Sequence, residues 1–267
     1  MRIMAELRLV QVDAFADRPF TGNTAAVMPL QQWLADEVMQ AIAMENNLAE
    51  TAFTIPSGDG DADYELRWFT PTVEVDLCGH ATLASGHVLM GDRAALRFRT
   101  RKSGILTVAR DGDGLSLDLP PIPVAAASEQ EELLAALGLD QAEVFLSTDS
   151  SQATAIILVA NSAAVRDCQP DFGRLKSIPL MAIVTAPGDE SDVDSRVFVP
   201  AWGIDEDPVT GSAHAALAPF WSDRLGRSDF TAYQASRRGG HLSCRLERGR
   251  VILGGRCVTL MEGVMRI

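Results

Sequence analysis

Two short helix starts built from small residues are the parts of the sequence best suited to chemistry. The first runs from Cys78 to Thr82 (CGHAT) and the second from Thr210 to His214 (TGSAH). Glycine lets a ligand approach the backbone closely, and the first turn of a helix carries unsatisfied N–H groups and partial positive charge. Two such starts facing each other would bind a carboxylate or stabilise an enolate. The alternative is that small residues only let each helix pack tightly in a core.

Three polar side chains accompany these starts. Glu50 is a single carboxylate in an apolar stretch, a setting that suits proton transfer to and from carbon; the alternative is an exposed strand-end glutamate. His80 lies in a first helical turn, where burial favours the neutral imidazole as an acid or base; the alternative is a capping histidine. Asp207 precedes Pro208 in a loop and could orient a histidine or bind a substrate amine, or it could only cap the loop.

Net charge limits the partners. Acidic residues outnumber basic ones 36 to 23, which gives a net charge of −13. This charge argues against nucleic acid or an anionic membrane as a partner, and a small anionic metabolite would need local donors. No run approaches the ~18 apolar residues of a membrane span. Residues 1–6 lack a secretory pattern, so we expect a cytoplasmic protein.

The sequence contains no pattern typical of a cofactor or a metal. No Gly-x-Gly-x-x-Gly follows a strand and no Gly-Lys-Ser/Thr phosphate loop occurs, so NAD, FAD and ATP have no support. The four cysteines include no Cys-x-x-Cys pair, which argues against structural zinc. His80 and His87 stand about two helical turns apart, too far for one ion. We therefore expect no cofactor and no metal.

Hydrophobic periodicity predicts the elements that hold these residues. An amphipathic helix is expected over 31–45, and largely apolar helices over 79–91 and 211–225. Most of the remaining chain alternates apolar and polar residues, as strands do. The pattern is not the regular alternation of strand and helix that a doubly wound sheet requires, which favours an α+β fold.

A proline-rich linker at 120–123 divides the chain. We predict an N-terminal domain over 1–118, to which the tail 262–267 is a candidate addition, and a C-terminal domain over 119–261. A faint repeat suggests that the halves are related, because a Phe-x-Pro motif and a polar loop precede each helix start.

Four ordered motifs resemble those of the PhzF-like phenazine biosynthesis family. They are Asp13 to Val27, Asn47 to Thr51, Cys78 to Leu83 and Glu206 to Ala213. The resemblance spans nearly the whole chain. It implies a diaminopimelate-epimerase-like α+β fold, with two pseudo-symmetric domains that each wrap a curved, mainly antiparallel sheet or barrel around a central helix. It also implies an active site in the cleft between the domains, a homodimer and no cofactor.

The resemblance further implies an isomerase that moves a proton between carbons of a small carboxylated substrate, which is cyclic in the best-known member. The family's general acid/base glutamate falls on Glu50, its supporting histidine on His80 and its aspartate on Asp207. The positions that would contact substrate are Gly79, Ala81, Gly211 and Ser212. Thr24 and Ala49 replace residues common in the family, which leaves the substrate open.

A single position separates this chain from the two-thiol relatives. Diaminopimelate epimerase and its kin use one cysteine from each half as an acid/base pair; Cys78 matches the first, but Thr210 stands at the second. A threonine hydroxyl is far too weak an acid for that role, so we expect Cys78 to be structural. Two alternatives stay open: a racemase or epimerase of an amino-acid-like substrate, which needs a second base opposite Glu50, and a non-catalytic binding protein that retains the fold.

Overall fold

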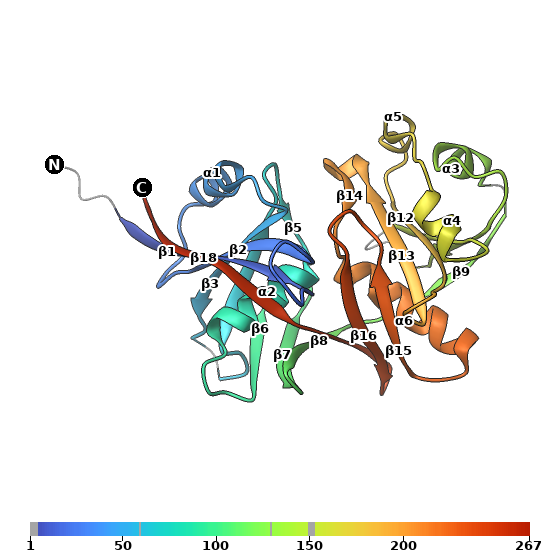
Figure 1. The fold of residues 1–267 in the computed structure, drawn as a ribbon. Helices are drawn as coiled ribbons and strands as arrows, with labels where there is room; N and C mark the ends of the chain where they lie inside the picture. Colours follow the sequence, from blue (N-terminus) through green and yellow to red (C-terminus); the bar gives the residue numbers. More distant parts are fainter. Residues whose placement is uncertain (1–4, 59, 129, 149–152) are drawn as a thin grey trace. The chain divides into compact units, whose positions relative to one another are not determined.

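The computed structural model describes residues 5–58, 60–128, 130–148 and 153–267, in which strands outnumber helices (Figure 1). Residues 1–4, on which the expectation about a secretory signal partly depends, lie outside this range. The chain divides into two compact units, Met1–Asp118 with Gly254–Ile267, and Leu119–Leu253. Among the described helices, none has the length and apolar character needed to cross a bilayer.

The C-terminal strand belongs to the first unit over its whole length. Strand β18 (Cys257–Arg266) pairs antiparallel with β1 (Glu6–Ala14), from Cys257 opposite Ala14 to Arg266 opposite Glu6. The chain therefore returns to the first unit at Gly254, earlier than the tail at 262 that the sequence suggested. The reason is the hydrogen-bonded ladder, which holds all of β18 against β1 and not only its last residues.

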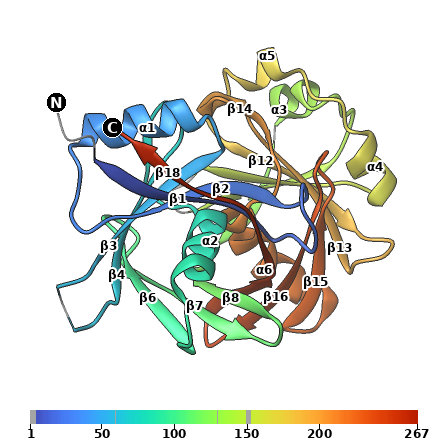
Figure 2. The ribbon, with the colours of Figure 1, turned by 60° about the vertical axis from the view of Figure 1, so that its left-hand side comes forward.

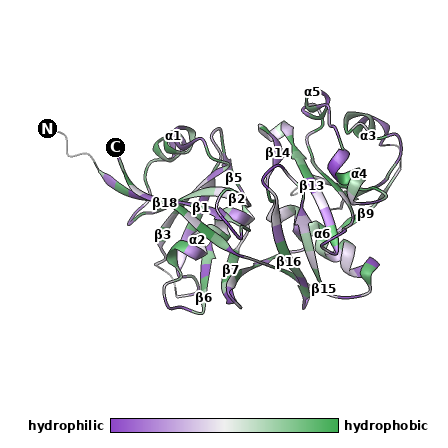
Figure 3. Ribbon diagram, viewed as in Figure 1, coloured by the Kyte–Doolittle hydropathy of each residue, from purple (hydrophilic) through white to green (hydrophobic). Residues whose placement is uncertain are grey.

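In the first unit, strands pair in the order β18-β1-β2-β3-β4-β6-β7-β8, and the short β5 pairs with β4. The pairs β2–β3 and β4–β6 are parallel and the others antiparallel. The strands are β2 (Asn23–Pro29), β3 (Glu50–Pro56), β4 (Tyr64–Phe69), β5 (Glu74–Val75), β6 (Ala95–Arg99), β7 (Ile105–Asp111) and β8 (Gly114–Leu119). In β6, the buried Leu96 and Phe98 alternate with the exposed Ala95 and Arg97. Figure 3 shows hydrophobic and hydrophilic residues mixed along the strands.

The second unit repeats this topology. Its strands pair in the order β9-β10-β11-β12-β13-β15-β16, the short β14 pairs with β13, and the parallel pairs β11–β12 and β13–β15 occupy the equivalent places. The predicted pseudo-symmetry is thereby confirmed. The strands are β9 (Val124–Ala127), β10 (Glu143–Ser147), β11 (Thr154–Leu158), β12 (Met181–Pro187), β13 (Val193–Val199), β14 (Ile204–Asp207), β15 (Asp229–Gln234), β16 (Gly240–Glu247) and β17 (Arg250–Gly255).

A largely buried helix follows the short strand in each unit. Helix α2 (Gly79–Leu89) follows β5, and α6 (Gly211–Leu225) follows β14, so the two helix starts occupy equivalent places. Helix α2 packs against β1, β2, β3, β7 and β18, and Figure 2 shows strands around it. A Cβ on Gly86 would lie 2.5 Å from Val108 Cγ1 of β7, so only glycine permits this approach.

The remaining helices are short and flank the sheets. Helix α1 (Asp36–Asn46) begins later than the predicted start at residue 31, because Asp36 and Glu37 suit the positive first turn. It ends at Asn47 in the left-handed conformation, which asparagine tolerates. The second unit carries α3 (Glu131–Ala136), α4 (Ser162–Asp167), α5 (Phe172–Leu175) and the 3₁₀ turn η1 (Pro200–Trp202).

Candidate functional site

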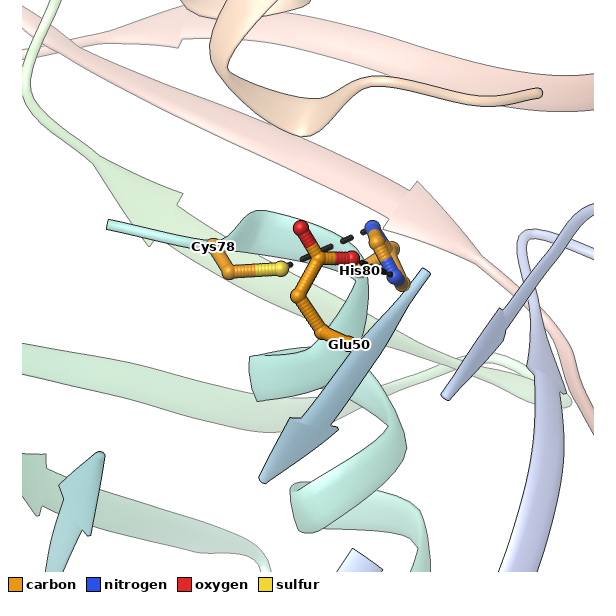
Figure 4. A group of neighbouring side chains, drawn as sticks. All are labelled: Glu50, Cys78 and His80. Atoms are coloured by element: carbon orange, nitrogen blue, oxygen red, sulfur yellow. Dashed lines mark hydrogen bonds and ion pairs between the residues drawn. The ribbon is translucent and has the colours of Figure 1, made fainter. Parts of the chain in front are cut away.

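A carboxylate and an imidazole meet in the first unit (Figure 4). Glu50 is the first residue of β3 and His80 lies in the first turn of α2. Glu50 Oε2 lies 3.0 Å from His80 Nε2, and the side chains are only 12% and 4% exposed. The fold brings them together because β3 runs parallel to β2, with Glu50 opposite Ala25, and α2 packs across both strands.

The other ring nitrogen of His80 faces Asn23 and Cys78. Asn23 Nδ2 lies 3.1 Å from His80 Nδ1, and Cys78 Sγ lies 3.6 Å from the same atom. In a neutral ring, Nδ1 accepts from the Asn23 amide N–H and the ring proton is on Nε2, facing Glu50. In a protonated ring both nitrogens donate, and Asn23 then accepts through its amide oxygen. The four residues therefore form one buried polar cluster, which we call the Glu50 cluster.

A tight turn places Asn23 in this cluster. Asn23 begins β2 directly after Gly22, which has φ +66°. A Cβ at Gly22 would lie 2.2 Å from the carbonyl oxygen of Ala14, so a larger residue would push the turn open. Asn23 lies within the motif from Asp13 to Val27, but no role was predicted for it from the sequence. The glycine before it, which indicates a tight turn, could have drawn attention to this position.

Electrostatics in the cluster differ from the expectation of a neutral imidazole. Burial, the largest single effect, lowers the pKa of His80, but Cys78 and Glu50 together outweigh it and raise that pKa well above 6.5. Burial and the Glu50 charge also raise the pKa of the Cys78 thiol to about 11. Because Cys78 is then a thiol at neutral pH, the Glu50 carboxylate is the charge that keeps His80 protonated there.

Two atoms of the cluster have unused hydrogen-bonding capacity. Glu50 Oε2 and His80 Nε2 are buried, and apart from each other neither has a hydrogen-bond partner among the described residues. Their 3.0 Å separation is an ion-pair contact. A buried polar atom without a partner is costly, so both atoms are available to a ligand.

A second cluster lies in the second unit. Asp207 is the last residue of β14, and not part of a loop as the sequence suggested, because β14 pairs with β13 and sets Asp207 opposite Val197. The Thr210 hydroxyl donates to Asp207 Oδ2 at 2.5 Å. Gln234, the last residue of β15, joins them from a distant part of the chain. We call these three residues the Asp207 cluster.

Gln234 uses both ends of its amide in this cluster. Its Nε2 donates to the Asp207 carbonyl at 2.7 Å and to Thr210 Oγ1 at 3.2 Å. Its Oε1 accepts from the Thr210 backbone N–H at 2.8 Å. Gln234 is fully buried, so it fixes the segment between β14 and α6. No role for Gln234 was predicted from the sequence, because its neighbours in the chain do not indicate a contact with positions 207 and 210.

The two helix starts share their capping chemistry. Cys78 and Thr210 occupy the N-cap positions of α2 and α6, and neither side chain caps its helix. In both, a side chain four residues later donates to the N-cap carbonyl: Thr82 Oγ1 to Cys78 O at 2.5 Å, and His214 Nδ1 to Thr210 O at 2.8 Å. First-turn N–H groups without a side-chain cap are suited to an anion.

The structure thus gathers the predicted site residues into two sets, each within its own unit. Glu50, Gly79, His80 and Ala81 belong to the first unit, and Asp207, Gly211 and Ser212 to the second. All except Glu50, which is partly buried, are buried. Cys78, for which a structural role is expected, contacts the His80 ring.

Comparison with known proteins supplies the family. The family model of phenazine biosynthesis-like proteins (PhzC-PhzF) matches residues 12–263. This chain belongs to that family. A family relative from Pseudomonas aeruginosa, named an uncharacterized isomerase, is 48% identical over 267 residues, which cover 98% of this chain and 100% of the relative. The crystal structure of a PhzF family protein from Enterococcus faecalis has 42% identity and a TM-score of 0.90, and the match covers 98% of this chain and 100% of that one.

A more distant neighbour confirms the fold class. A hydroxyproline epimerase from Agrobacterium vitis has a TM-score of 0.64 at 14% identity, and the match covers 98% of this chain and 93% of that chain. At this identity only the fold is shared. The family member described here therefore has the diaminopimelate-epimerase-like α+β fold of two pseudo-symmetric halves.

Proposed function

We propose that this chain is an isomerase that moves a proton between carbon atoms of a small carboxylated substrate, with Glu50 as its general acid and base. The observation that carries the proposal is the largely buried Glu50 carboxylate, whose Oε2 lies 3.0 Å from His80 Nε2 and has no other hydrogen-bond partner among the described residues. A relative that is 48% identical is named an isomerase, which supports the reaction class.

In the proposed reaction, Glu50 takes a proton from one carbon and returns it to another. The protonated His80 stabilises negative charge beside the carboxylate, and as an N–H donor it is suited to an oxygen of the enolate. Glu50 both accepts the proton and returns it, so the proposed reaction requires no cofactor.

We propose that the Asp207 cluster and the α6 start bind the same substrate. The start of α6 at Gly211 and Ser212 is suited to a carboxylate because of the partial positive charge of a first helical turn and its small side chains. Asp207 would bind a polar group of the substrate, either a hydroxyl or an amine. Residues on both helix starts, including Gly79 and Ala81, would supply the close contacts that small side chains permit.

Solvent exchange tests the role of Glu50. The protein is incubated in D₂O with a panel of small carboxylates that includes a dihydro-hydroxyanthranilate, and deuterium uptake is measured by mass spectrometry. We expect Glu50→Gln to slow uptake by about 10²–10⁴-fold, the usual range for a general base. Glu45→Gln, the same change at an exposed position of α1, is the matched control. Uptake that is equal in Glu50→Gln and in the parent would refute the proposal.

The product of the same experiment separates the alternatives. A positional isomer supports the proposed reaction, whereas an inverted stereocentre in an amino-acid-like substrate indicates an epimerase. An epimerase needs a second base opposite Glu50, and the Thr210 hydroxyl, which donates to Asp207, is not suited to that role. A ligand that binds without any deuterium uptake indicates a non-catalytic binding protein.

We also keep the homodimer as a proposal, supported by the exposed apolar side chains of Met261 and Val264 on β18. Light scattering on a sizing column measures the mass directly, and a monomer at all concentrations would contradict it. Nucleic acid and membranes remain unexpected partners because of the net charge of −13.

A further inference from the structure

Three side chains of the Glu50 cluster have the donor types of a zinc site. Glu50, Cys78 and His80 each offer one ligand atom, and these atoms all lie within 4.8 Å of one another (Figure 4). Carboxylate oxygen, thiolate sulfur and imidazole nitrogen are the ligands that Zn²⁺ takes in proteins. The residues stand at the start of β3 and the start of α2, so regular elements hold all three.

A second observation indicates that something can bind between them. Glu50 Oε2 and His80 Nε2 are buried, and beyond their mutual 3.0 Å ion-pair contact neither has a hydrogen-bond partner among the described residues. Two donors bound to one tetrahedral ion at about 2.0–2.1 Å stand roughly 3.3 Å apart, close to that separation. An ion that bridges them would satisfy both atoms. His80 Nδ1 faces Asn23, which leaves Nε2 as the nitrogen for an ion.

We propose that the Glu50 cluster binds a thiophilic divalent cation, with Zn²⁺ as the type case, through Glu50 Oε2, Cys78 Sγ and His80 Nε2. On binding, the Cys78 thiol and the protonated His80 each lose one proton to solvent; three metal–ligand bonds form as waters leave the hydrated ion, and no electron is transferred. The cysteine moves toward the other two ligands by side-chain rotation. Three protein ligands leave a fourth position for water.

The donor set determines which cations bind. A thiolate and an imidazole favour Zn²⁺ and Co²⁺, whereas Mg²⁺ and Ca²⁺ prefer oxygen ligands alone. An ion at this place occupies the carboxylate that we propose as the acid/base, so it inhibits the reaction reversibly. The inhibition rests on the proposed function, but the binding site does not.

Cobalt spectroscopy tests the site on the full chain without any assay of activity. The protein is freed of metal with a chelator and titrated with Co²⁺, and sulfur-to-cobalt charge-transfer absorption is recorded. We expect this absorption in the parent protein and in Cys257→Ser, a cysteine of the same unit, and its loss in Cys78→Ser. Absence of the band in the parent protein, or its persistence in Cys78→Ser, overturns the proposal.

Zinc affinity gives a second, independent measurement. In competition with a chromophoric chelator, Cys78→Ser and His80→Gln should weaken Zn²⁺ binding by at least about 10–100-fold, the loss that even an outer-shell partner causes. Circular dichroism and thermal unfolding verify that each variant folds; if one does not, the cobalt band of the parent protein still decides. Mg²⁺ in place of Zn²⁺ should not compete, and competition by Mg²⁺ would contradict a thiolate site.

Deuterium exchange then tests the inhibition. Zn²⁺ should suppress uptake by the parent protein, and chelator should restore it. Zinc that binds with full affinity yet leaves uptake unchanged refutes the inhibition while leaving the site in place. Conversely, a cobalt band in the parent protein together with unchanged uptake in Glu50→Gln would refute the proposed function and preserve the site, so the two failures are distinguishable.

Discussion

His80 Nε2 lies 3.0 Å from Glu50 Oε2, although Glu50 begins a strand and His80 lies in the first turn of a helix that comes later in the chain. This contact makes the charge of one residue depend on the other. Burial alone would hold the imidazole neutral, and the neighbouring charge reverses that outcome.

The first prediction concerns the titration of His80. The pKa of His80 is raised well above 6.5 because the charges beside it outweigh burial. In Glu50→Gln one of the two groups that raise the pKa is removed while burial remains, so the His80 pKa should fall. NMR titration of the imidazole resonances measures both values, and Glu45→Gln should leave the His80 pKa as in the parent. A His80 pKa that does not fall in Glu50→Gln would show that Glu50 does not determine its charge.

The second prediction concerns Gln234. Gln234→Ala removes three hydrogen bonds and leaves the Thr210 N–H and the Asp207 carbonyl without their partner. Each unsatisfied buried group costs about 1–3 kcal/mol, so urea unfolding should show a loss of several kcal/mol. Because the segment between β14 and α6 loosens, KM should rise more than kcat falls.

The matched control for Gln234 is Gln32→Ala, the same change at an exposed position, which should alter neither stability nor KM. A folded Gln234→Ala protein with parental stability and KM would show that the amide does not hold the Asp207 cluster.

The third prediction concerns stability in acid. Burial lowers the pKa of His214 to about 4, below its ordinary 6.5. Between these values the unfolded chain binds a proton that the folded chain does not, so the stabilising effect is complete above pH 6.5 and is lost as the pH falls toward 4. The difference corresponds to about 3 kcal/mol. Urea unfolding at several pH values should therefore show a steeper loss in the parent protein than in His214→Gln.

The control for His214 is His241→Gln, which changes an exposed histidine of the same unit and should keep the parental pH dependence. Parallel pH profiles for the parent protein and His214→Gln would exclude His214 as a source of acid sensitivity.

The fourth prediction concerns the packing of α2. Gly86→Ala places a methyl group 2.5 Å from Val108 Cγ1, closer than carbon atoms approach. Overpacking of this kind costs about 1–3 kcal/mol, measured as a lower midpoint in thermal or urea unfolding. Gly60→Ala is the control, because a Cβ there meets nothing within 4 Å. Adding Val108→Ala to Gly86→Ala should destabilise less than the sum of the single changes.

Several features follow from local patterns in the sequence. Small residues at 79 and 211 predict close-packed helix starts, and α2 and α6 begin at these positions. The motif order predicts the family and the α+β fold, both of which the comparisons confirm. The Asp207–Thr210 hydrogen bond joins residues only three positions apart, so their order in the chain already places the two side chains near each other.

Contacts between segments that are distant in the chain could not be predicted from the sequence. Asn23 and Gln234 contact the two clusters because β2 begins, and β15 ends, beside them, and their own neighbours in the chain do not reveal this. Cys78 was expected to be structural, since its only recognised counterpart, Thr210, is no thiol. In the structure, the Cys78 sulfur lies 3.6 Å from His80 Nδ1, and the ligand atoms of Cys78, His80 and Glu50 all lie within 4.8 Å of one another.

The sequence by itself determined which chemical groups the protein carries: one carboxylate at Glu50, one imidazole at His80 and two helix starts built from small residues. The tertiary structure decided which groups touch and in what charge state. The parallel pairing of β2 with β3 and the packing of α2 across them set the 3.0 Å contact, and that contact overcomes the effect of burial on His80. Charge state depends on neighbours in space, which the order of residues alone does not specify.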